Sequence, residues 1–408
     1  MPEAPLLKCR PEDFRVEEIL EPQLLPIGKG LFHIYRLKKT GWTTADAIDC
    51  IARSSSVPKN EIRSAGRKDK HAVTIQFLSS PARYPLVSHE KMLELQETGG
   101  LDVSLAPSAI KENHFKLTLR RIHPSLSASL HSVLEQQGQY GFPNYFDEQR
   151  FRSVGKSGAF LAERIAKKQF SGALKLYLCE DRRRDSAQDR ERRKLYSNNW
   201  GDWEKLFILS KSIAEQRILD TLRQRPGKEG LTAALSLIPR DDLEMYFAAW
   251  QSSLWNETLS LIMNRESISG STVCNTGGFL LFPSDIKKAH SLLNKMEIPT
   301  AASRLLFCEE KIRAGVMDVL EKHDIRLSQM NMRKMRAVHF SSFYRHAWAI
   351  PRNFKIGTSE PDPLHAARLR QEIEFTLPRG SYATMLVKAG WAALSSPLTV
   401  KSGDLPHH

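Results

Sequence analysis

Residues 65–76 read A-G-R-K-D-K-H-A-V-T-I-Q, a basic loop that runs directly into a strand-like stretch. From residue 73 to 77 apolar and polar side chains alternate, which is the period of two typical of a β-strand. Asp69 is the carboxylate of this loop and has Lys68 and Lys70 as its neighbours. Nearby cations favour the ionised form of a carboxylate, so Asp69 is suited to act as a nucleophile or base. Taken alone, the loop also fits an ordinary turn aspartate among lysines.

Outward from this loop, strand-like stretches occur near both ends of the chain. Residues 31–37 are rich in strand formers, and residues 373–377 alternate between apolar and polar side chains. Residues 115–120 alternate as well, which predicts Phe115, Leu117 and Leu119 inward and Lys116, Thr118 and Arg120 outward. Period two with one polar face is typical of a mostly antiparallel sheet. We also expect a helix over residues 44–52, capped by Thr43 or Thr44, and another that begins at Ser125 and stops at Gly138.

The middle of the chain has a different pattern. Helical periodicity dominates from about residue 158 to 265, and residues 271–340 combine a short strand after Gly277-Gly278 with helices over 286–293 and 312–322. Strands at both ends with helices between predict a catalytic sheet interrupted by an insertion. We therefore assign 1–157 and 341–396 to a discontinuous catalytic domain, 158–340 to the insertion and 397–408 to a tail.

The charge balance favours a polyanionic partner. Lys plus Arg number 60 against 46 for Asp plus Glu, a net charge of +14 spread over 408 residues, which is typical of proteins that bind nucleic acid. The five cysteines include no C-x-x-C pair, and no apolar run reaches the length of a signal peptide or a membrane span. We therefore expect a cytoplasmic protein with no metal, no cofactor and no membrane contact, and a monomer by default.

The densest run of charge lies in the insertion. Residues 181–194 carry seven basic and four acidic side chains in the order D-R-R-R-D-S-A-Q-D-R-E-R-R-K. A mixed run of this kind fits a solvated helix or loop, and contact with RNA phosphates is the alternative.

Five stretches resemble, in order, the motifs of the TruD family of tRNA pseudouridine synthases. The loop at 65–76 is similar to the family's G-x-K-D-x-x-A-x-T-x-Q. The other four are L-L-K-C-R-P-E-D-F-R-V-E-E-I at 6–19, F-P-N-Y-F-D-E-Q-R-F at 142–151, A-A-W-Q-S-S-L-W-N at 248–256 and F-T-L-P-R-G-S-Y-A-T-M-L-V-K at 375–388. One match would be weak, but five in the family's order across the chain make the resemblance specific.

The resemblance implies an α+β fold of the pseudouridine-synthase type, with a mixed, mostly antiparallel sheet flanked by helices and a TRUD-type insertion. It implies tRNA as the partner and the uridine at the thirteenth position, in the D-arm, as the target. Asp69 matches the family's catalytic aspartate, and Lys8 matches a lysine near that carboxylate. An ionised carboxylate could attack C1′, attack C6 or remove the 2′ proton, and the sequence does not choose among these.

The resemblance also implies a pocket for the target nucleotide. Phe14, Asn144 and Tyr382 match positions that contact this nucleotide in the family, and Phe146 is expected to support them. The chemistry agrees, because a uridine pulled out of its stack needs an aromatic platform. An asparagine amide has both a donor and an acceptor, which suits the mixed edge of uracil.

Two positions depart from the family pattern. Asp147 and Arg152 stand where the family has glycines, so the backbone beside Asn144 is a candidate for a different path. This departure gives weight to a second reading, a non-catalytic RNA-binding or chaperone protein that keeps the fold. Such a protein would not require Asp69 in its complete loop. An RNA methyltransferase is disfavoured because no glycine-rich cofactor loop follows an early strand.

Overall fold

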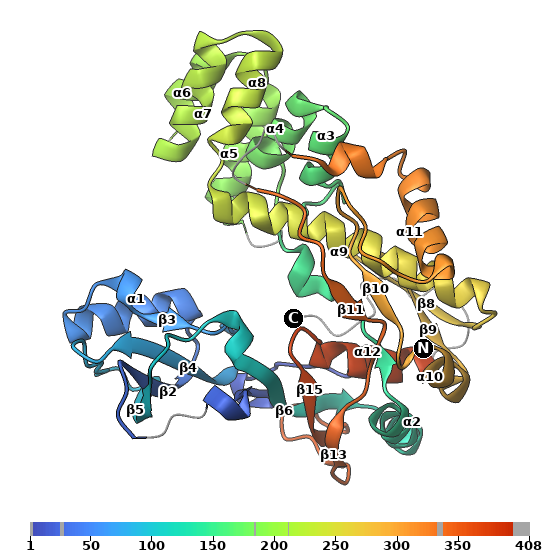
Figure 1. The fold of residues 1–408 in the computed structure, drawn as a ribbon. Helices are drawn as coiled ribbons and strands as arrows, with labels where there is room; N and C mark the ends of the chain where they lie inside the picture. Colours follow the sequence, from blue (N-terminus) through green and yellow to red (C-terminus); the bar gives the residue numbers. More distant parts are fainter. Residues whose placement is uncertain (1–2, 25–27, 183–184, 211, 333–337, 395–408) are drawn as a thin grey trace. The chain divides into compact units, whose positions relative to one another are not determined.

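The computed structural model describes residues 3–24, 28–182, 185–210, 212–332 and 338–394. These residues form two compact units: unit 1 contains residues 3–143 and 349–394, and unit 2 contains residues 144–348 (Figure 1). The divisions predicted from the sequence are at 157/158 and 340/341, and the assignment of a catalytic domain and an insertion stays a prediction. The tail expected at 397–408 lies outside the described residues.

Unit 1 is built on one mixed sheet. Its described strands are β1 (Phe14–Leu20), β2 (Phe32–Thr40), β3 (Arg63–Ser64), β4 (Val73–Pro81), β5 (Leu93–Leu101), β6 (Ile110–Ile122), β13 (Arg352–Ile356), β14 (Glu360–Pro361) and β15 (Leu369–Pro378). The order is β13-β15-β6-β1-β4-β2-β5, with β14 beside β15 and β3 beside β4. Of these pairs β1 and β4 run parallel, and the others are antiparallel. A mostly antiparallel sheet with helices confirms the predicted α+β class.

Three α-helices belong to this unit: α1 (Thr44–Ser55), α2 (Ser127–Tyr140) and α12 (Ala383–Leu394). The side chain of Thr43 caps α1 by accepting a hydrogen bond from the backbone N–H of Asp46, as predicted. Beneath α1, the buried side chains of Leu37 and Leu78 join those of the helix in one apolar cluster. The remaining elements are the short strand β7 (Phe142–Pro143) and the 3-10 helices η1 (Pro11–Asp13), η2 (Pro22–Leu24), η3 (Lys59–Glu61), η4 (Pro107–Ala109) and η5 (Pro124–Leu126).

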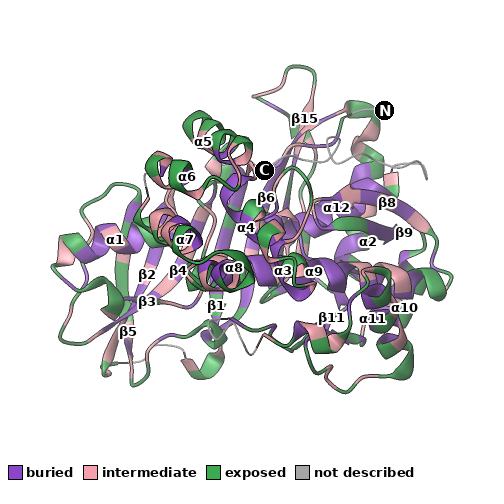
Figure 2. Ribbon diagram, turned by 90° about the horizontal axis from the view of Figure 1, so that it is seen from above, coloured by how far each residue is buried: buried purple, intermediate pink, exposed green. Residues whose placement is uncertain are grey.

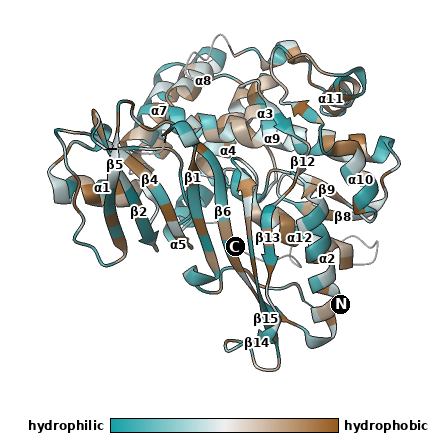
Figure 3. Ribbon diagram, turned by 60° about the horizontal axis from the view of Figure 1, so that its bottom comes forward, coloured by the Kyte–Doolittle hydropathy of each residue, from teal (hydrophilic) through white to brown (hydrophobic). Residues whose placement is uncertain are grey.

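The sheet alternates as predicted, but its polar positions are not all exposed. In β4 the buried side chains include Thr74 and Gln76, and the hydroxyl of Thr44 donates to Gln76 Oε1. In β6, Thr118 and Arg120 were expected to face outward and are buried instead. Figure 3 shows hydrophilic bands along these strands. Both faces of the sheet are therefore covered in places, and the predicted solvent face is wrong at these positions because distant segments of the chain pack over it.

The end of α2 differs from the prediction. Gly138 was expected to stop this helix, but the helix continues to Tyr140 and its C-cap is Gly141, which has a φ of +85°. Gly138 is needed for another reason: a Cβ at this position would lie 2.2 Å from the ring of Phe354 on β13. The glycine therefore marks a close approach of two elements, not a helix end.

Unit 2 is largely helical, as the periodicity predicted. Its helices are α3 (Leu161–Ala166), α4 (Phe170–Cys179), α5 (Ala187–Asn198), α6 (Trp203–Leu209), α7 (Ile213–Gln224), α8 (Gly227–Ser236), α9 (Arg240–Arg265), α10 (Ile286–Leu293), α11 (Glu310–Lys322), with the 3-10 helices η6 (Glu148–Phe151) and η7 (Leu327–Met330). The long helix α9 is buried along much of its length (Figure 2). It contacts α3, α11 and two strands of the same unit, so it is the central core element of unit 2.

The described strands of unit 2 are short. β8 (Gly270–Asn275) and β9 (Gly278–Pro283) form one antiparallel hairpin, and β10 (Glu297–Pro299) pairs with β11 (Tyr344–His346). A further strand, β12 (Trp348–Ala349), follows β11. The strand predicted after Gly277-Gly278 and the helix predicted over 286–293 are both confirmed.

One ionic cluster joins three helices of unit 2. His323 follows α11, and its Nε2 lies 2.7 Å from Glu257 Oε2 of α9, while its Nδ1 lies 3.9 Å from Glu163 Oε1 of α3. The neighbouring carboxylates of Glu163 and Glu257 raise the pKa of His323 from 6.5 to about 9. The imidazolium therefore links α3, α9 and α11 at neutral pH.

We predict that His323→Gln destabilises unit 2 in a pH-dependent way. Because the folded-state pKa is above the unfolded value, the stabilisation is complete below about pH 6.5 and lost as the pH rises through about 9. After allowance for solvent screening we expect a loss of about 1–2 kcal/mol at low pH. Thermal unfolding from about pH 6 to about pH 10 measures this, with the exposed His339→Gln as control. A destabilisation that is the same at all pH values would contradict the assignment.

Candidate active site

The N-terminal segment is held against the sheet by a buried ion cluster. The guanidinium of Arg120 on β6 donates to both carboxylate oxygens of Asp13, and its Nη1 donates to Asp362 Oδ1 at 2.9 Å. The backbone of Leu6 also exchanges two hydrogen bonds with that of Arg120, each 2.9 Å long. Residues 6–13 are thus fixed at both ends. Lys8 lies between these anchors with a φ of +62°, a left-handed conformation that a non-glycine residue adopts only when its surroundings enforce it.

Lys8 brings three of the predicted site residues together. Its Nζ lies 2.7 Å from Asp69 Oδ2, and the two side chains are only 3% and 10% exposed. The same ammonium lies 4.2 Å from the ring centroid of Phe14, within the range of a cation–π interaction. The second oxygen, Asp69 Oδ1, accepts a hydrogen bond from the backbone N–H of Lys70 at 2.8 Å. A cation this close favours an ionised carboxylate.

The other lysine beside Asp69 points into the protein. Lys68 Nζ lies 3.0 Å from Glu18 Oε1 and donates to Asn113 Oδ1 at 2.6 Å. Burial raises the pKa of Glu18, and Lys68 opposes this rise. Glu18 also accepts a hydrogen bond from the backbone N–H of Phe77, so the ion pair ties the loop to β1 and β4. Glu18 was not among the residues predicted from the sequence, although a signal was present: it lies on the same buried face of β1 as Phe14, Val16 and Leu20.

The other three predicted site residues belong to other segments of the chain. Tyr382 is half-buried and directly precedes α12 in unit 1. Asn144 and Phe146 belong to unit 2. The structure therefore brings Lys8, Asp69 and Phe14 into one cluster, whereas the predicted roles of the other three residues stay predictions.

Asn144 is embedded in a network within unit 2. Its Nδ2 donates to the carbonyl of His346 at 3.0 Å, and its Oδ1 accepts from Arg345 Nη2 at 2.9 Å. Arg345 Nε also donates to the carbonyl of Asn144 at 2.9 Å. The Arg345 guanidinium lies 4.0 Å from the ring centroid of Phe146, which packs edge-on against Trp255. Arg345 is thus a supporting residue that the sequence analysis missed.

A second missed residue is Asn256 on α9. Its Oδ1 accepts from the backbone N–H of Phe146 at 2.8 Å, and its Nδ2 donates to the carbonyl of Phe146 at 2.9 Å. The side chain therefore pairs with the backbone as a neighbouring strand would. A signal was present, since Asn256 ends the motif at 248–256.

The two departures from the family glycines are accommodated locally. Asp147 has a φ of −96° and Arg152 a φ of −60°, so neither position requires glycine. The buried Asp147 side chain accepts from the backbone N–H of Glu148 and thereby caps η6.

The described residues contain no group of three or more His, Cys, Asp or Glu side chains that could hold a metal ion. No helix among them is long and apolar enough to cross a membrane.

Comparison with known proteins gives consistent matches. The family model described as tRNA pseudouridine synthase D (TruD) matches residues 5–389. The tRNA pseudouridine synthase D of Leptospira interrogans is 31% identical over 390 residues, which cover 94% of this chain and 95% of that protein. Its counterpart from Aquifex aeolicus is 28% identical and covers 94% of this chain and 97% of its own. A Methanosarcina mazei crystal structure described as TruD shares the fold, with a TM-score of 0.70, 22% identity and coverage of 97% and 95%.

We predict that Asn256→Ala destabilises unit 2 by about 2–3 kcal/mol, because it leaves the backbone N–H and C=O of Phe146 buried without these partners. Asn264→Ala, at an exposed position of the same helix, serves as the control and should change the stability by less than about 0.5 kcal/mol. Chemical denaturation measures both. Equal effects of the two substitutions would show that the pairing with Phe146 contributes nothing specific.

Proposed function

This chain belongs to the TruD family of tRNA pseudouridine synthases and is an isomerase, and we propose that Asp69 is its catalytic carboxylate. The proposed target is the uridine at the thirteenth position of tRNA, in the D-arm. The observation that carries the proposal is the Lys8–Asp69 ion pair beside the ring of Phe14. A buried carboxylate with a cation on one oxygen stays ionised, which is the form that the reaction requires.

The reaction breaks the bond between N1 of uracil and C1′, turns the base and joins it again through C5. The product is an isomer of the substrate, so no atom or electron is consumed overall. Asp69 could attack C1′, attack C6 or remove the 2′ proton. In each case Lys8 compensates the carboxylate charge before the reaction and holds its orientation. The target uridine must leave its stack, which costs a few kcal/mol.

The aromatic and amide residues are proposed to bind the extruded uridine. Phe14 and Tyr382 offer rings, and one base–aromatic contact contributes roughly 1–3 kcal/mol. Asn144 is proposed to contact the uracil edge. Its amide already has partners in unit 2, but an amide nitrogen carries two hydrogens and its oxygen two lone pairs. Phe146 and Arg345 support this amide, and their packing fixes its direction.

We predict that Asp69→Asn abolishes isomerisation and leaves tRNA affinity within a few-fold of wild type, since the side chain keeps its size and loses one negative charge. Tritium release from tRNA labelled at C5 of uridine measures turnover. Asp102→Asn, which alters an exposed carboxylate of the same unit, is the control and should be fully active. Turnover by the Asp69 variant would contradict the assignment of Asp69 as the catalytic carboxylate. A wild-type protein that binds tRNA without turnover would favour the non-catalytic RNA-binding reading.

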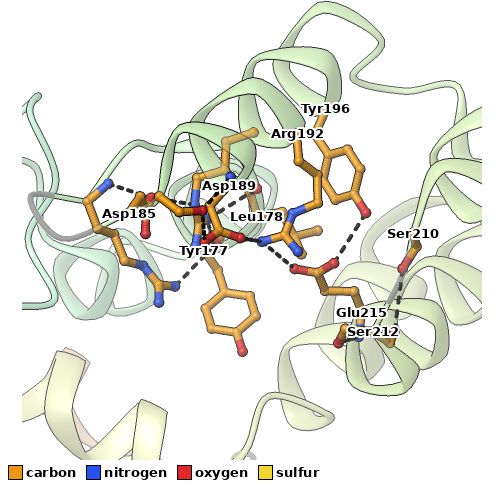
Figure 4. Close-up of polar contacts among 12 residues, drawn as sticks. Tyr177, Leu178, Asp185, Asp189, Arg192, Tyr196, Ser210, Ser212 and Glu215 are labelled. Atoms are coloured by element: carbon orange, nitrogen blue, oxygen red, sulfur yellow. Dashed lines mark hydrogen bonds and ion pairs between the residues drawn. The ribbon is translucent and has the colours of Figure 1, made fainter.

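The charged run at 181–194 is only partly available to RNA. Arg193 of α5 is buried, donates to the carbonyls of Tyr177 and Leu178 near the end of α4, and pairs with Asp185. Arg192 pairs with Asp189 at 3.0 Å and Glu215 at 3.6 Å (Figure 4). A cation at the last carbonyls of a helix stabilises that helix end. These arginines therefore hold α4, α5 and α7 together.

Two basic residues of this run, Arg190 and Lys194, are exposed on α5. Arg182, in contrast, packs over the rings of Tyr177 and Tyr246 and donates to the carbonyl of Tyr177. Arg183 and Arg184 lie outside the described residues. We propose that Arg190 and Lys194 supply the contacts of α5 with tRNA phosphates.

We predict that replacing both Arg190 and Lys194 by Gln flattens the slope of log K against log salt by about 1.4–1.8, because each phosphate contact contributes roughly 0.7–0.9. Arg193→Gln is the matched comparison: it should lower the stability of unit 2 and leave the slope unchanged. Filter binding of tRNA over a range of salt concentrations measures the slopes. An unaltered slope for the double variant would indicate that α5 is a solvated helix that makes no contact with RNA phosphates.

A further inference from the structure

Lys39, near the end of β2, has a fully buried side chain, with 0% of the residue exposed. In the strand register Lys39 lies opposite Thr74 and Leu37 lies opposite Gln76, so Lys39 shares the face that α1 covers. Its neighbour Lys38 instead pairs with Glu94 at the surface. A lysine at a core position is uncommon, because its ammonium loses the hydration that stabilises the charge.

The buried ammonium is bound by two backbone carbonyls. Lys39 Nζ donates to the carbonyl of Trp42 at 2.7 Å and to the carbonyl of Asp69 at 3.0 Å. The pKa of Lys39 is lowered to about 8, mainly by burial and also by the charge of Lys68, while the negative charges of Asp69 and Glu18 oppose the shift. These are the charged groups that face Lys39 from the loop and from β1. Lys39 therefore loses its proton only slightly above neutral pH.

Lys39 completes the support of Asp69. Lys8 holds Oδ2 of the carboxylate, the N–H of Lys70 holds Oδ1, and Lys39 holds the carbonyl oxygen of the same residue. The contact of Lys39 comes from inside the sheet, whereas Lys8 comes from the N-terminal segment. Both the side chain and the peptide group of Asp69 are thus fixed by cations. The carbonyl of Asp69 and the N–H of Lys70 belong to the same peptide group, so a rotation of this group would break the bond to Lys39 and take the N–H of Lys70 away from Oδ1 of the carboxylate.

We propose that Lys39 is a positioning residue: its ammonium sets where the Asp69 carboxylate stands, and the enzyme loses rate when Lys39 loses its proton. This rests on the proposed function, because it takes Asp69 as the catalytic carboxylate. A charged donor binds a carbonyl about twice as strongly as a neutral one, so deprotonation loosens the loop. The same titration stabilises the fold as the pH rises above about 8, because the unfolded chain still binds the proton. The titration of Lys39 by itself therefore does not unfold the protein in this range.

The test measures single-turnover rates on tRNA from about pH 6.5 to about pH 9.5 for the wild type, Lys39→Met, Lys39→Arg and the surface control Lys38→Met. We expect the wild-type rate to fall as the pH rises through about 8, and Lys38→Met to behave in the same way. Lys39→Met should lower the rate by roughly ten- to hundredfold, the size expected for a displaced reacting group, with tRNA affinity nearly unchanged. Lys39→Arg keeps its charge over this range and should move the alkaline limb to higher pH.

Three outcomes would overturn the inference: a wild-type rate that does not fall across this range, a folded Lys39→Met variant with the wild-type rate, or a Lys39→Arg variant that keeps the wild-type alkaline limb. If Lys39→Met does not fold, the pH profiles of the wild type and of Lys39→Arg still test the inference. Failure here is distinct from failure of the proposed function. An inactive Asp69→Asn variant beside a fully active Lys39→Met variant removes only the role of Lys39, whereas an active Asp69→Asn variant removes the proposed function itself.

Discussion

The ion pair between Lys8 and Asp69 is the constraint on which the site depends. Both side chains are almost removed from solvent, and a buried charge is tolerated only when it is paired and hydrogen-bonded. The N-terminal segment must therefore stay in place for the loop to keep its form. The buried Asp13–Arg120–Asp362 cluster meets this requirement by tying that segment to β6 and to the C-terminal part of the chain.

The two units use polar side chains in the same way. In unit 1, lysines on several sides fix one aspartate. In unit 2, the amide of Asn256 and the guanidinium of Arg345 fix the backbone and side chains of residues 144–146. Residues supported in this way have little freedom to rearrange, which is the condition for a pre-organised site. Of these supporting residues, Lys39, Asn256 and Arg345 are not among the site residues predicted from the sequence.

The surplus of positive charge indicates which class of partner the protein binds, but it does not indicate which basic residues contact that partner. The net charge of +14 suits RNA. Within the densest basic segment, however, Arg193 caps a helix end and Arg192 joins two helices through carboxylates. Basic residues that serve the fold cannot also neutralise phosphates, so exposure has to be known before a run of arginines is interpreted as an RNA contact.

The sequence by itself determined the α+β class, the alternation of the strands, the cap of α1 and the loop that carries Asp69. These features depend on residues close together in the chain, where side-chain period and turn chemistry act. The tertiary structure decided which polar residues are buried. Lys8 and Asp69 are 61 positions apart and Arg120 and Asp362 are 242 apart, so no local pattern shows that they meet. Gln76 and Arg120 have the local pattern of solvent-facing residues, and only the segments packed over them make a buried position stable.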